Sequence, residues 1–212
     1  MRVKICGLTR AEDAALAQEL GAWALGFVFY PKSKRYIDPQ QAQTIIQTLP
    51  NPARAIGVFV NQTDEALAIA KKIPLGGVQL HGDETPEDCK KVKQNFSGLV
   101  IKAFRPETED DLNAIHLYKG AVDYILLDAA APGQWGGTGK TTDWTLAAKA
   151  AEIGIPLILA GGLTAENILA ADRQVKPFAL DLSSGVEISP GIKDTDKLKR
   201  LFRAIQGDEH ES

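Results

Sequence analysis

The sequence has little that would place it outside the cell or in a membrane. No part of its 212 residues contains the roughly eighteen continuous apolar residues that a membrane-spanning helix needs. Lys4 and Arg10 interrupt any apolar segment at the N-terminus, so we predict no signal peptide there. The two cysteines, Cys6 and Cys89, are too few for a disulfide framework. We therefore expect a protein of the reducing cytoplasm.

The composition also argues against a metal site and against nucleic acid as a partner. The sequence has three histidines, spaced far apart, and no Cys and His spacing typical of zinc. Its net charge is −3, so there is no basic excess of the kind that binds nucleic acid. Apolar residues make up 44% and charged residues 24%, which are ordinary values for a globular protein. We expect neither a bound metal, nor nucleic acid, nor a membrane as partner.

Apolar, β-rich segments alternate with helical segments along the chain. We predict strands at 2–6, 24–29, 54–60, 76–80, 99–104, 123–128, 156–160 and 178–182. We predict helices at 10–20, 40–49, 63–72, 86–95, 108–117, 143–152, 164–172 and 194–206. Asp38 and Thr85, each followed by proline, and Asp194 are the expected helix caps.

Strict alternation of strands and helices requires parallel strands joined by crossover helices. Eight such units in 212 residues indicate an α/β fold, namely a compact (β/α)8 or TIM barrel. Periodicity alone leaves a doubly wound open sheet as the alternative. Because no proline-rich linker, low-complexity tract or charge run divides the chain, we expect a single barrel domain over 1–212.

Two titratable residues stand at strand ends, where a parallel barrel places its chemistry. Cys6 ends the first strand, and Gly7 permits a sharp exit from it. Asp128 ends the apolar sixth strand. Cys6 is either a small buried hydrophobe or a general base, and Asp128 is either a solvated loop residue or a general acid. Lys4 either lowers the pKa of the thiol or extends to solvent.

Glycine-rich turns follow the seventh and eighth strands. Gly161 and Gly162 come after the seventh strand, and Ser183, Ser184 and Gly185 come after the eighth. Backbone N–H groups in such turns can approach an anion closely, and a short helix beginning at Ser184 would favour phosphate. Glycines also make tight turns with no ligand, but two adjacent turns of this composition are the usual phosphate site of the barrel.

Three further features have both a structural and a functional interpretation. Arg35 lies in a basic loop between two tyrosines, and either it is solvated or it binds a carboxylate in a bidentate manner. His81 follows the fourth strand and either binds substrate or has a structural hydrogen bond. Residues 136–141 resemble a phosphate-binding loop. That motif needs a glycine at position 134, where this chain has Gln134, so we predict a glycine-rich lid instead.

Taken together, the motifs resemble those of one family, the phosphoribosylanthranilate isomerases of tryptophan biosynthesis. The resemblance covers essentially the whole chain and rests on residues 3–7, 26–29, 33–36, 58–61, 78–82, 127–128, 136–141, 160–163 and 181–187. It implies a cytoplasmic intramolecular oxidoreductase that interconverts an aldose and a ketose. In this Amadori rearrangement N-(5-phosphoribosyl)anthranilate becomes 1-(2-carboxyphenylamino)-1-deoxyribulose 5-phosphate, without cofactor or metal.

The resemblance also implies roles for individual residues. Cys6 would be the general base and Asp128 the general acid, and Arg35 would hold the anthranilate carboxylate. The residues that the resemblance places in contact with the phosphoribosyl substrate are Arg35, His81, Gly161, Gly162, Asp181, Ser183, Ser184 and Gly185. The family comparison leaves a monomer or a homodimer open. Cys89 lies within a predicted helix and keeps a structural interpretation.

Other functions remain as alternatives. The nearest is another TIM-barrel phosphosugar isomerase, such as that of histidine biosynthesis, which carries aspartate where this chain has Cys6. Its substrate has a phosphate at each end, whereas only one phosphate site is predicted here. A non-catalytic sensor of phosphate ligands is disfavoured by the pair of Cys6 and Asp128. A nucleotide switch is disfavoured by Gln134.

Overall fold

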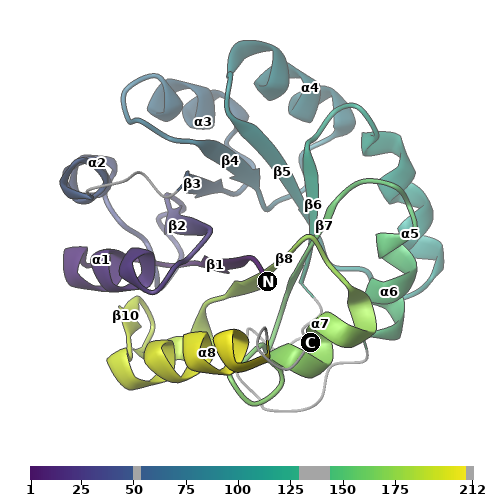
Figure 1. The fold of residues 1–212 in the computed structure, drawn as a ribbon. Coiled ribbons are helices and arrows are strands. Elements are labelled where there is room, and N and C mark those ends of the chain that lie inside the picture. Colours follow the sequence, from purple (N-terminus) through teal and green to yellow (C-terminus); the bar gives the residue numbers. More distant parts are fainter. Residues whose placement is uncertain (50–53, 129–143, 209–212) are drawn as a thin grey trace.

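The computed structural model describes residues 1–49, 54–128 and 144–208. The first eight strands of the chain pair in sequence order, and the eighth pairs with the first, so that they form a closed parallel barrel. The helices surround the strands in a ring, and the last helix, drawn in yellow, lies beside the first, drawn in purple (Figure 1). The predicted (β/α)8 fold is confirmed, and the alternative of a doubly wound open sheet is wrong.

The strands begin and end close to the predicted positions. They are β1 (Val3–Ile5), β2 (Ala24–Val28), β3 (Arg54–Phe59), β4 (Gly77–Leu80), β5 (Leu99–Phe104), β6 (Tyr124–Asp128), β7 (Leu157–Ala160) and β8 (Ala179–Leu182). The apolar segments form strands because both faces are buried, one by the barrel interior and one by the helices. The segments are therefore mostly apolar, and the polar members Lys4, Gln79, Lys102 and Asp181 are themselves buried.

The helices also follow the predicted order. They are α1 (Ala11–Glu19), α2 (Pro39–Thr48), α3 (Thr63–Ala70), α4 (Pro86–Asn95), α5 (Asp110–Ile115), α6 (Thr145–Ala151), α7 (Ile168–Val175) and α8 (Thr195–Asp208). The predicted caps are confirmed: Asp38 accepts from the N–H of Gln40, Thr85 and Asp88 form a capping box, and Asp194 accepts from the first turn of α8.

Helix α7 begins four residues later than predicted, and a side chain explains the difference. The carboxamide of Asn167 accepts from the N–H of Thr164 at 2.8 Å and donates to the carbonyl of Gly162 at 3.0 Å. Local side-chain bonds of this kind compete with helical geometry, and the segment after β7 forms a turn that leads into α7. The turn that we predict to bind phosphate is therefore fixed by Asn167.

Four short elements complete the described chain, three of which the sequence did not predict. They are the 3-10 helices η1 (His116–Tyr118) and η2 (Ser184–Val186) and the two-stranded antiparallel hairpin β9 (Glu187–Ser189) and β10 (Ile192–Lys193). The short helix expected to begin at Ser184 is confirmed as η2. Gly191, at φ +84°, permits the turn of the hairpin.

The interior of the barrel has an aromatic end and a polar end. Small and branched side chains fill its middle: Ala24, Ile56, Ile101, Ala103, Leu126, Ile158, Ala160 and Ala179. At the amino ends of the strands Phe178 packs against Trp23 and Tyr124, with ring centroids 5.4 and 4.6 Å apart, and the Arg2 guanidinium lies 4.5 Å from its ring. The carboxyl ends of the strands therefore form the polar end.

No helix in the described part of the chain is both long and apolar enough to cross a membrane.

Candidate active site

The alternation of side chains along each strand brings the predicted site residues to the polar end of the barrel. Lys4 and Cys6 are two residues apart at the end of β1, so they point the same way. Asp181 on β8 stands directly beside Lys4 in the strand register. Asp128 ends β6 two residues beyond Leu126, a side chain of the barrel interior. The two titratable groups proposed for chemistry thus share one face of the sheet.

Cys6 occupies a tight, mostly apolar space. Its side chain is 8% exposed and packs with Val28 and Val58, while Tyr30 covers it. A Cβ added to Gly26 would lie 2.7 Å from the sulfur, so glycine at this position of β2 makes room for the thiol. Burial raises the pKa of the Cys6 thiol above its ordinary value. The free thiol is therefore protonated at neutral pH.

Two buried lysines oppose that effect of burial. The positive charges of Lys4 and Lys193 each favour the thiolate of Cys6, whereas Asp181 disfavours it. Lys4 has no solvent exposure, and its Nζ lies 3.0 Å from both carboxylate oxygens of Asp181. The alternative that Lys4 extends to solvent is wrong. The ammonium is instead fixed beneath the thiol by an ion pair inside the barrel.

Asp181 is predicted to bind substrate, and the structure shows what it already contacts. Burial raises the pKa of Asp181, the ion pair with Lys4 opposes the increase, and the charge of Asp128 adds to it. The carboxylates of β6 and β8 are thus near enough to interact. A role for Asp181 in substrate binding stays a prediction, because both its oxygens contact Lys4 in the free protein.

Asp128 is partly open to solvent and has a cationic neighbour. Its carboxylate is 24% exposed and lies 3.6 Å from Nε of Arg105, which follows β5. Nη2 of Arg105 also lies 3.0 Å from Nε2 of His81. Arg105 therefore connects the residue that ends β6 with the residue that follows β4. The sequence gave no sign of this connection, because Arg105 stands in no motif.

His81 is held from both sides. Its Nδ1 lies 2.9 Å from the side-chain amide of Gln79, and its Nε2 lies 3.0 Å from Arg105, which can only donate. Burial and then the charge of Arg105 lower the pKa of His81 to about 3. The ring is therefore neutral. The structural hydrogen bond predicted as one alternative is present, and substrate binding by His81 stays a prediction.

The two glycine-rich turns meet beside a pocket of about 300 Å³. Gly161 and Gly162 have φ values of +94° and +64°, which L side chains rarely adopt. A Cβ added to Gly185 would lie 1.9 Å from the carbonyl oxygen of Leu163, so η2 packs directly against the turn after β7. The pocket is lined by Gly162, Thr164, Ala165, Glu166, Ser184, Gly185, Lys197 and Arg200. The lining thus combines the two turns with the cations Lys197 and Arg200 and with one carboxylate, Glu166, which lies 3.5 Å from Arg200. The turns and the cations suit an anion.

Ser183 precedes this pocket and has a spare hydrogen-bonding group. Its hydroxyl oxygen is buried and has no hydrogen-bond partner among the described residues. Buried hydroxyls are nearly always bonded, so an unbonded one beside a proposed binding site indicates a group that a ligand satisfies. This observation supports the prediction that Ser183 contacts substrate.

Arg35 is ordered rather than freely solvated. Its Nε donates to Glu187 Oε1 at 2.9 Å and its Nη2 donates to Glu187 Oε2 at 2.7 Å. A Cβ added to Gly7 would lie 2.5 Å from Cδ of Arg35, so the arginine stem crosses the backbone directly after Cys6. The interpretation of Arg35 as a solvated loop residue is therefore wrong. Binding of a carboxylate by Arg35 stays a prediction.

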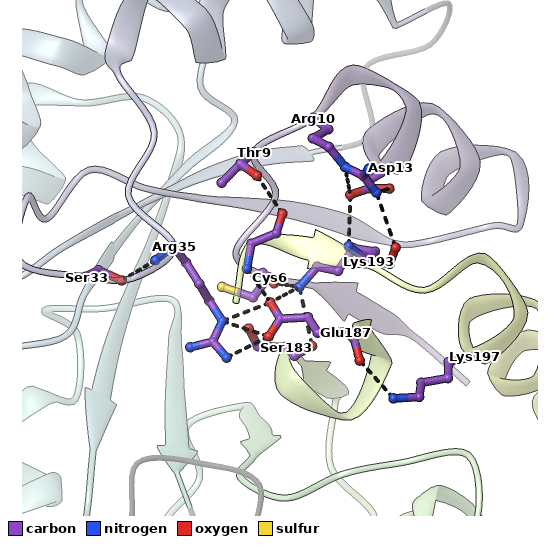
Figure 2. Close-up of polar contacts among 11 residues, drawn as sticks. Cys6, Thr9, Arg10, Asp13, Ser33, Arg35, Ser183, Glu187, Lys193 and Lys197 are labelled. Atoms are coloured by element: carbon purple, nitrogen blue, oxygen red, sulfur yellow. Dashed lines mark hydrogen bonds and ion pairs between the residues drawn. The ribbon is translucent and has the colours of Figure 1, made fainter. Parts of the chain in front are cut away.

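Glu187 and Lys193 are site residues that the sequence interpretation did not identify. Figure 2 shows both on the hairpin after β8, gathered with Arg35 and Ser183 beside Cys6. Lys193 Nζ donates to the carbonyls of Cys6 at 2.6 Å and Ser183 at 3.3 Å. Glu187 ends the motif at 181–187, but no pattern in the sequence indicated that it or Lys193 belongs to the site. The hairpin that carries both residues is too short to show periodicity.

Two other predictions have different outcomes. Cys89 is fully buried on α4, and burial raises its pKa to about 12, which confirms the structural interpretation. The predicted lid at 136–141 lies outside the described residues. Among the described residues, no three His, Cys, Asp or Glu side chains gather where they could hold a metal ion.

A closed parallel barrel with its titratable groups and glycine-rich turns at the carboxyl ends of the strands defines a (β/α)8-barrel enzyme. Residues 3–204 match the sequence profile of the family described as "N-(5'phosphoribosyl)anthranilate (PRA) isomerase". The chain belongs to this family of isomerases.

Individual relatives agree with the family match. The chain is similar to isomerases of that name from Trichlorobacter lovleyi, at 48% identity over 96% of this chain and 97% of the relative, and from Pseudomonas putida, at 49% identity over 97% and 98%. The crystal structure of the Thermotoga maritima phosphoribosyl anthranilate isomerase superposes with a TM-score of 0.90 at 45% identity, covering 98% of this chain and 99% of that one. A second isomerase structure, at TM-score 0.86 and 43% identity over 98% and 99%, is a complex with reduced 1-(o-carboxyphenylamino)-1-deoxyribulose 5-phosphate.

Proposed function

We propose that this isomerase converts N-(5'-phosphoribosyl)anthranilate into 1-(2-carboxyphenylamino)-1-deoxyribulose 5-phosphate, with Cys6 as general base and Asp128 as general acid. The observation that carries the assignment is the common position of the two residues at the carboxyl ends of β1 and β6, on the inner face of one barrel. Membership of the isomerase family supplies the reaction. The geometry supports the role of each group in it.

Binding begins with the two charged ends of the substrate. The phosphate is proposed to lie at the turns of Gly161 and Gly162 and of Ser184 and Gly185, where N–H groups and positive φ values allow close approach. The anthranilate carboxylate is proposed to bind Arg35, which lies with Ser183 and Glu187 beside Cys6 (Figure 2). Two anchors of this kind fix the ribose between the acid and the base.

Asp128 starts the reaction by giving its proton to the ring oxygen of the furanose. The bond between C1′ and that oxygen breaks, and the lone pair of the anthranilate nitrogen forms a C=N bond to C1′. The product of this step is an open-chain iminium and a carboxylate at position 128. Arg105 at 3.6 Å then stabilises that carboxylate by its positive charge.

Cys6 completes the rearrangement by removing the proton from C2′. The electrons of the C–H bond form a C1′=C2′ double bond, and the C=N electrons return to nitrogen. The resulting enolamine becomes the ketone by proton transfer to C1′. Because the iminium accepts the electrons, the proposed mechanism needs no cofactor. The thiol must first lose its proton, which the charges of Lys4 and Lys193 favour.

The test is an assay of purified protein in which loss of substrate fluorescence follows turnover. We expect Cys6→Ser and Asp128→Asn each to lower kcat by about 10²–10⁴-fold, the usual contribution of one proton-transfer group. Cys89→Ala is the matched control, because it removes a buried thiol that lies on α4, away from the strand ends. Near-normal turnover in either site variant would remove that residue from its proposed role.

Location and assembly belong to the same proposal. We place the enzyme in the cytoplasm, because a thiol base must stay reduced, and both cysteines are free. A monomer and a homodimer both fit, and a relative from Thermotoga maritima is described as dimeric. Light scattering coupled to size exclusion distinguishes the two states by mass.

A further inference from the structure

Glu187 is a buried carboxylate whose two oxygens are both occupied. Only 5% of its side chain is exposed. Arg35 donates to both oxygens, and Oε1 also accepts from the Nζ of Lys193 at 2.8 Å and from the N–H of Gly191 at 3.2 Å. Four donor groups from three residues therefore fix the carboxylate in one orientation.

Lys193 attaches this carboxylate to the framework of the site. Its Nζ, which has no solvent exposure, also donates to the carbonyls of Cys6 and Ser183. Its own N–H donates to Asp13 at 2.9 Å, so the hairpin is also tied to α1. Glu187 is thus rigidly placed relative to the ends of β1 and β8.

The contact with Glu187 uses only one edge of the Arg35 guanidinium. Nε and one side of Nη2 face Glu187, and the N–H groups of Nη1 and the other side of Nη2 form the opposite edge. That edge has the fork geometry that binds a second carboxylate in a bidentate manner. The side chain is 28% exposed, so the guanidinium remains open to a ligand.

We propose that Glu187 is a positioning residue for substrate specificity, which holds Arg35 by one edge so that the other edge receives the anthranilate carboxylate. The inference rests on the proposed function, in which Arg35 binds that carboxylate. Glu187 itself does not touch the substrate. It acts by removing the rotational freedom of a long side chain before the substrate arrives.

In a Glu187→Gln variant, the loss of charge and the loss of Arg35 orientation would have opposite effects on binding of a carboxylate ligand. Burial raises the pKa of Glu187, but Arg35 and Lys193 together outweigh it, so the pKa lies below its usual value and the group is ionised. Glu187→Gln would therefore remove one negative charge from the neighbourhood of the bound carboxylate, which alone would strengthen binding of an anion. Loss of orientation would weaken it. The sign of the measured effect decides between them.

The experiment measures Kd by calorimetry for two stable ligands. One is the reduced product analogue with its ring carboxylate, and the other is the same phenylamino ribitol phosphate without it. For the wild type we expect tighter binding of the carboxylated ligand. In Glu187→Gln we expect that preference to fall by about tenfold, the effect of one misplaced charge-assisted hydrogen bond. The Kd of the ligand without carboxylate should stay within about twofold.

Matched variants separate this role from a general effect on the fold. Glu87→Gln makes the same change at an exposed ion pair on α4 and should leave the preference unchanged. Glu187→Asp keeps a charge for Lys193 but withdraws the carboxylate from Arg35 by one methylene. This variant should also lose preference for the carboxylated ligand, and it replaces Glu187→Gln in the test if Glu187→Gln does not fold.

An unchanged or increased preference in the position-187 variants would overturn the inference. If the wild type binds neither ligand, the proposed function fails, and the inference fails with it. If the wild type binds both ligands with the expected preference and the variants keep it, only the role of Glu187 is lost. The preference is a ratio of two Kd values for one protein, so partial unfolding of a variant does not imitate the expected result.

Discussion

At the residue scale, the central feature is the thiol of Cys6, whose neighbours shift its pKa in opposite directions. Burial against Val28 and Val58 raises the pKa of Cys6, while Lys4 and Lys193 lower it. Apolar contact protects the thiol and excludes water, and the buried ammonium groups favour the thiolate that the proposed mechanism requires. Neither influence can be read from Cys6 alone.

This balance predicts the pH dependence of catalysis. A general base must be unprotonated, and the raised pKa of Cys6 keeps the thiol protonated at neutral pH. The proposed mechanism also needs a proton on Asp128, so the Asp128→Asn variant isolates the base. We expect its residual kcat/KM to rise with pH above 7, by up to tenfold per pH unit, until the thiol is ionised. A pH profile of kcat/KM between pH 5 and 9 checks this. An ascending limb that is complete below pH 6 would exclude a thiol base with a raised pKa.

At the scale of elements, the proposed phosphate site depends on how two turns pack. Helix η2 approaches the turn after β7 so closely that Gly185 leaves no space for a side chain. Asn167 holds the same turn from the other side by bonds to Gly162 and Thr164. The site is therefore a property of two neighbouring loops that the barrel brings together.

The close approach predicts the effect of a single methyl group. In Gly185→Ala the new Cβ would meet the carbonyl oxygen of Leu163 at 1.9 Å, so η2 must move away from the turn. We expect kcat/KM to fall by on the order of tenfold to a hundredfold, as for a misplacement of about 1 Å. Steady-state kinetics provide the measurement. Gly207→Ala, in α8 with no atom within 4 Å of the new Cβ, should leave the kinetics unchanged.

At the scale of the whole molecule, the barrel interior contains ionisable groups that make stability depend on pH. His81 is neutral in the folded protein, because burial and the charge of Arg105 lower its pKa to about 3. In the unfolded chain the same group titrates near 6.5. Between these values the unfolded chain binds one more proton than the folded protein. The free energy of unfolding must therefore fall as the pH falls below 6.5.

We expect this fall to be measurable by chemical denaturation between pH 7 and 5, above the range in which carboxylates titrate. The slope attributable to His81 is at most about 1.4 kcal/mol per pH unit, and less because the ring is partly exposed. His81→Gln should reduce the slope, whereas His116→Gln, at an exposed position on η1, should keep it. Equal slopes in the wild type and His81→Gln would show that His81 is not held neutral.

The sequence by itself determined the order of elements and most of the residues proposed for the site. Continuous apolar segments and helix caps such as Asp38 and Thr85 are local signals, so they predicted the strands and helices to within a few residues. Strand ends are also local, which is why Cys6 and Asp128 could be named in advance. The start of α7 was predicted too early, because the side-chain bonds of Asn167 favour a turn before Ile168.

Tertiary structure alone decided which charges meet. Lys4 and Asp181 are 177 residues apart in the chain, and Arg35 and Glu187 are 152 apart. Such pairs have no spacing or period in the sequence, since only closure of the barrel brings β1 beside β8. The same closure sets the burial that shifts the pKa of Cys6. The sequence therefore supplied the groups proposed for catalysis, and the fold supplied the neighbours that tune and position them.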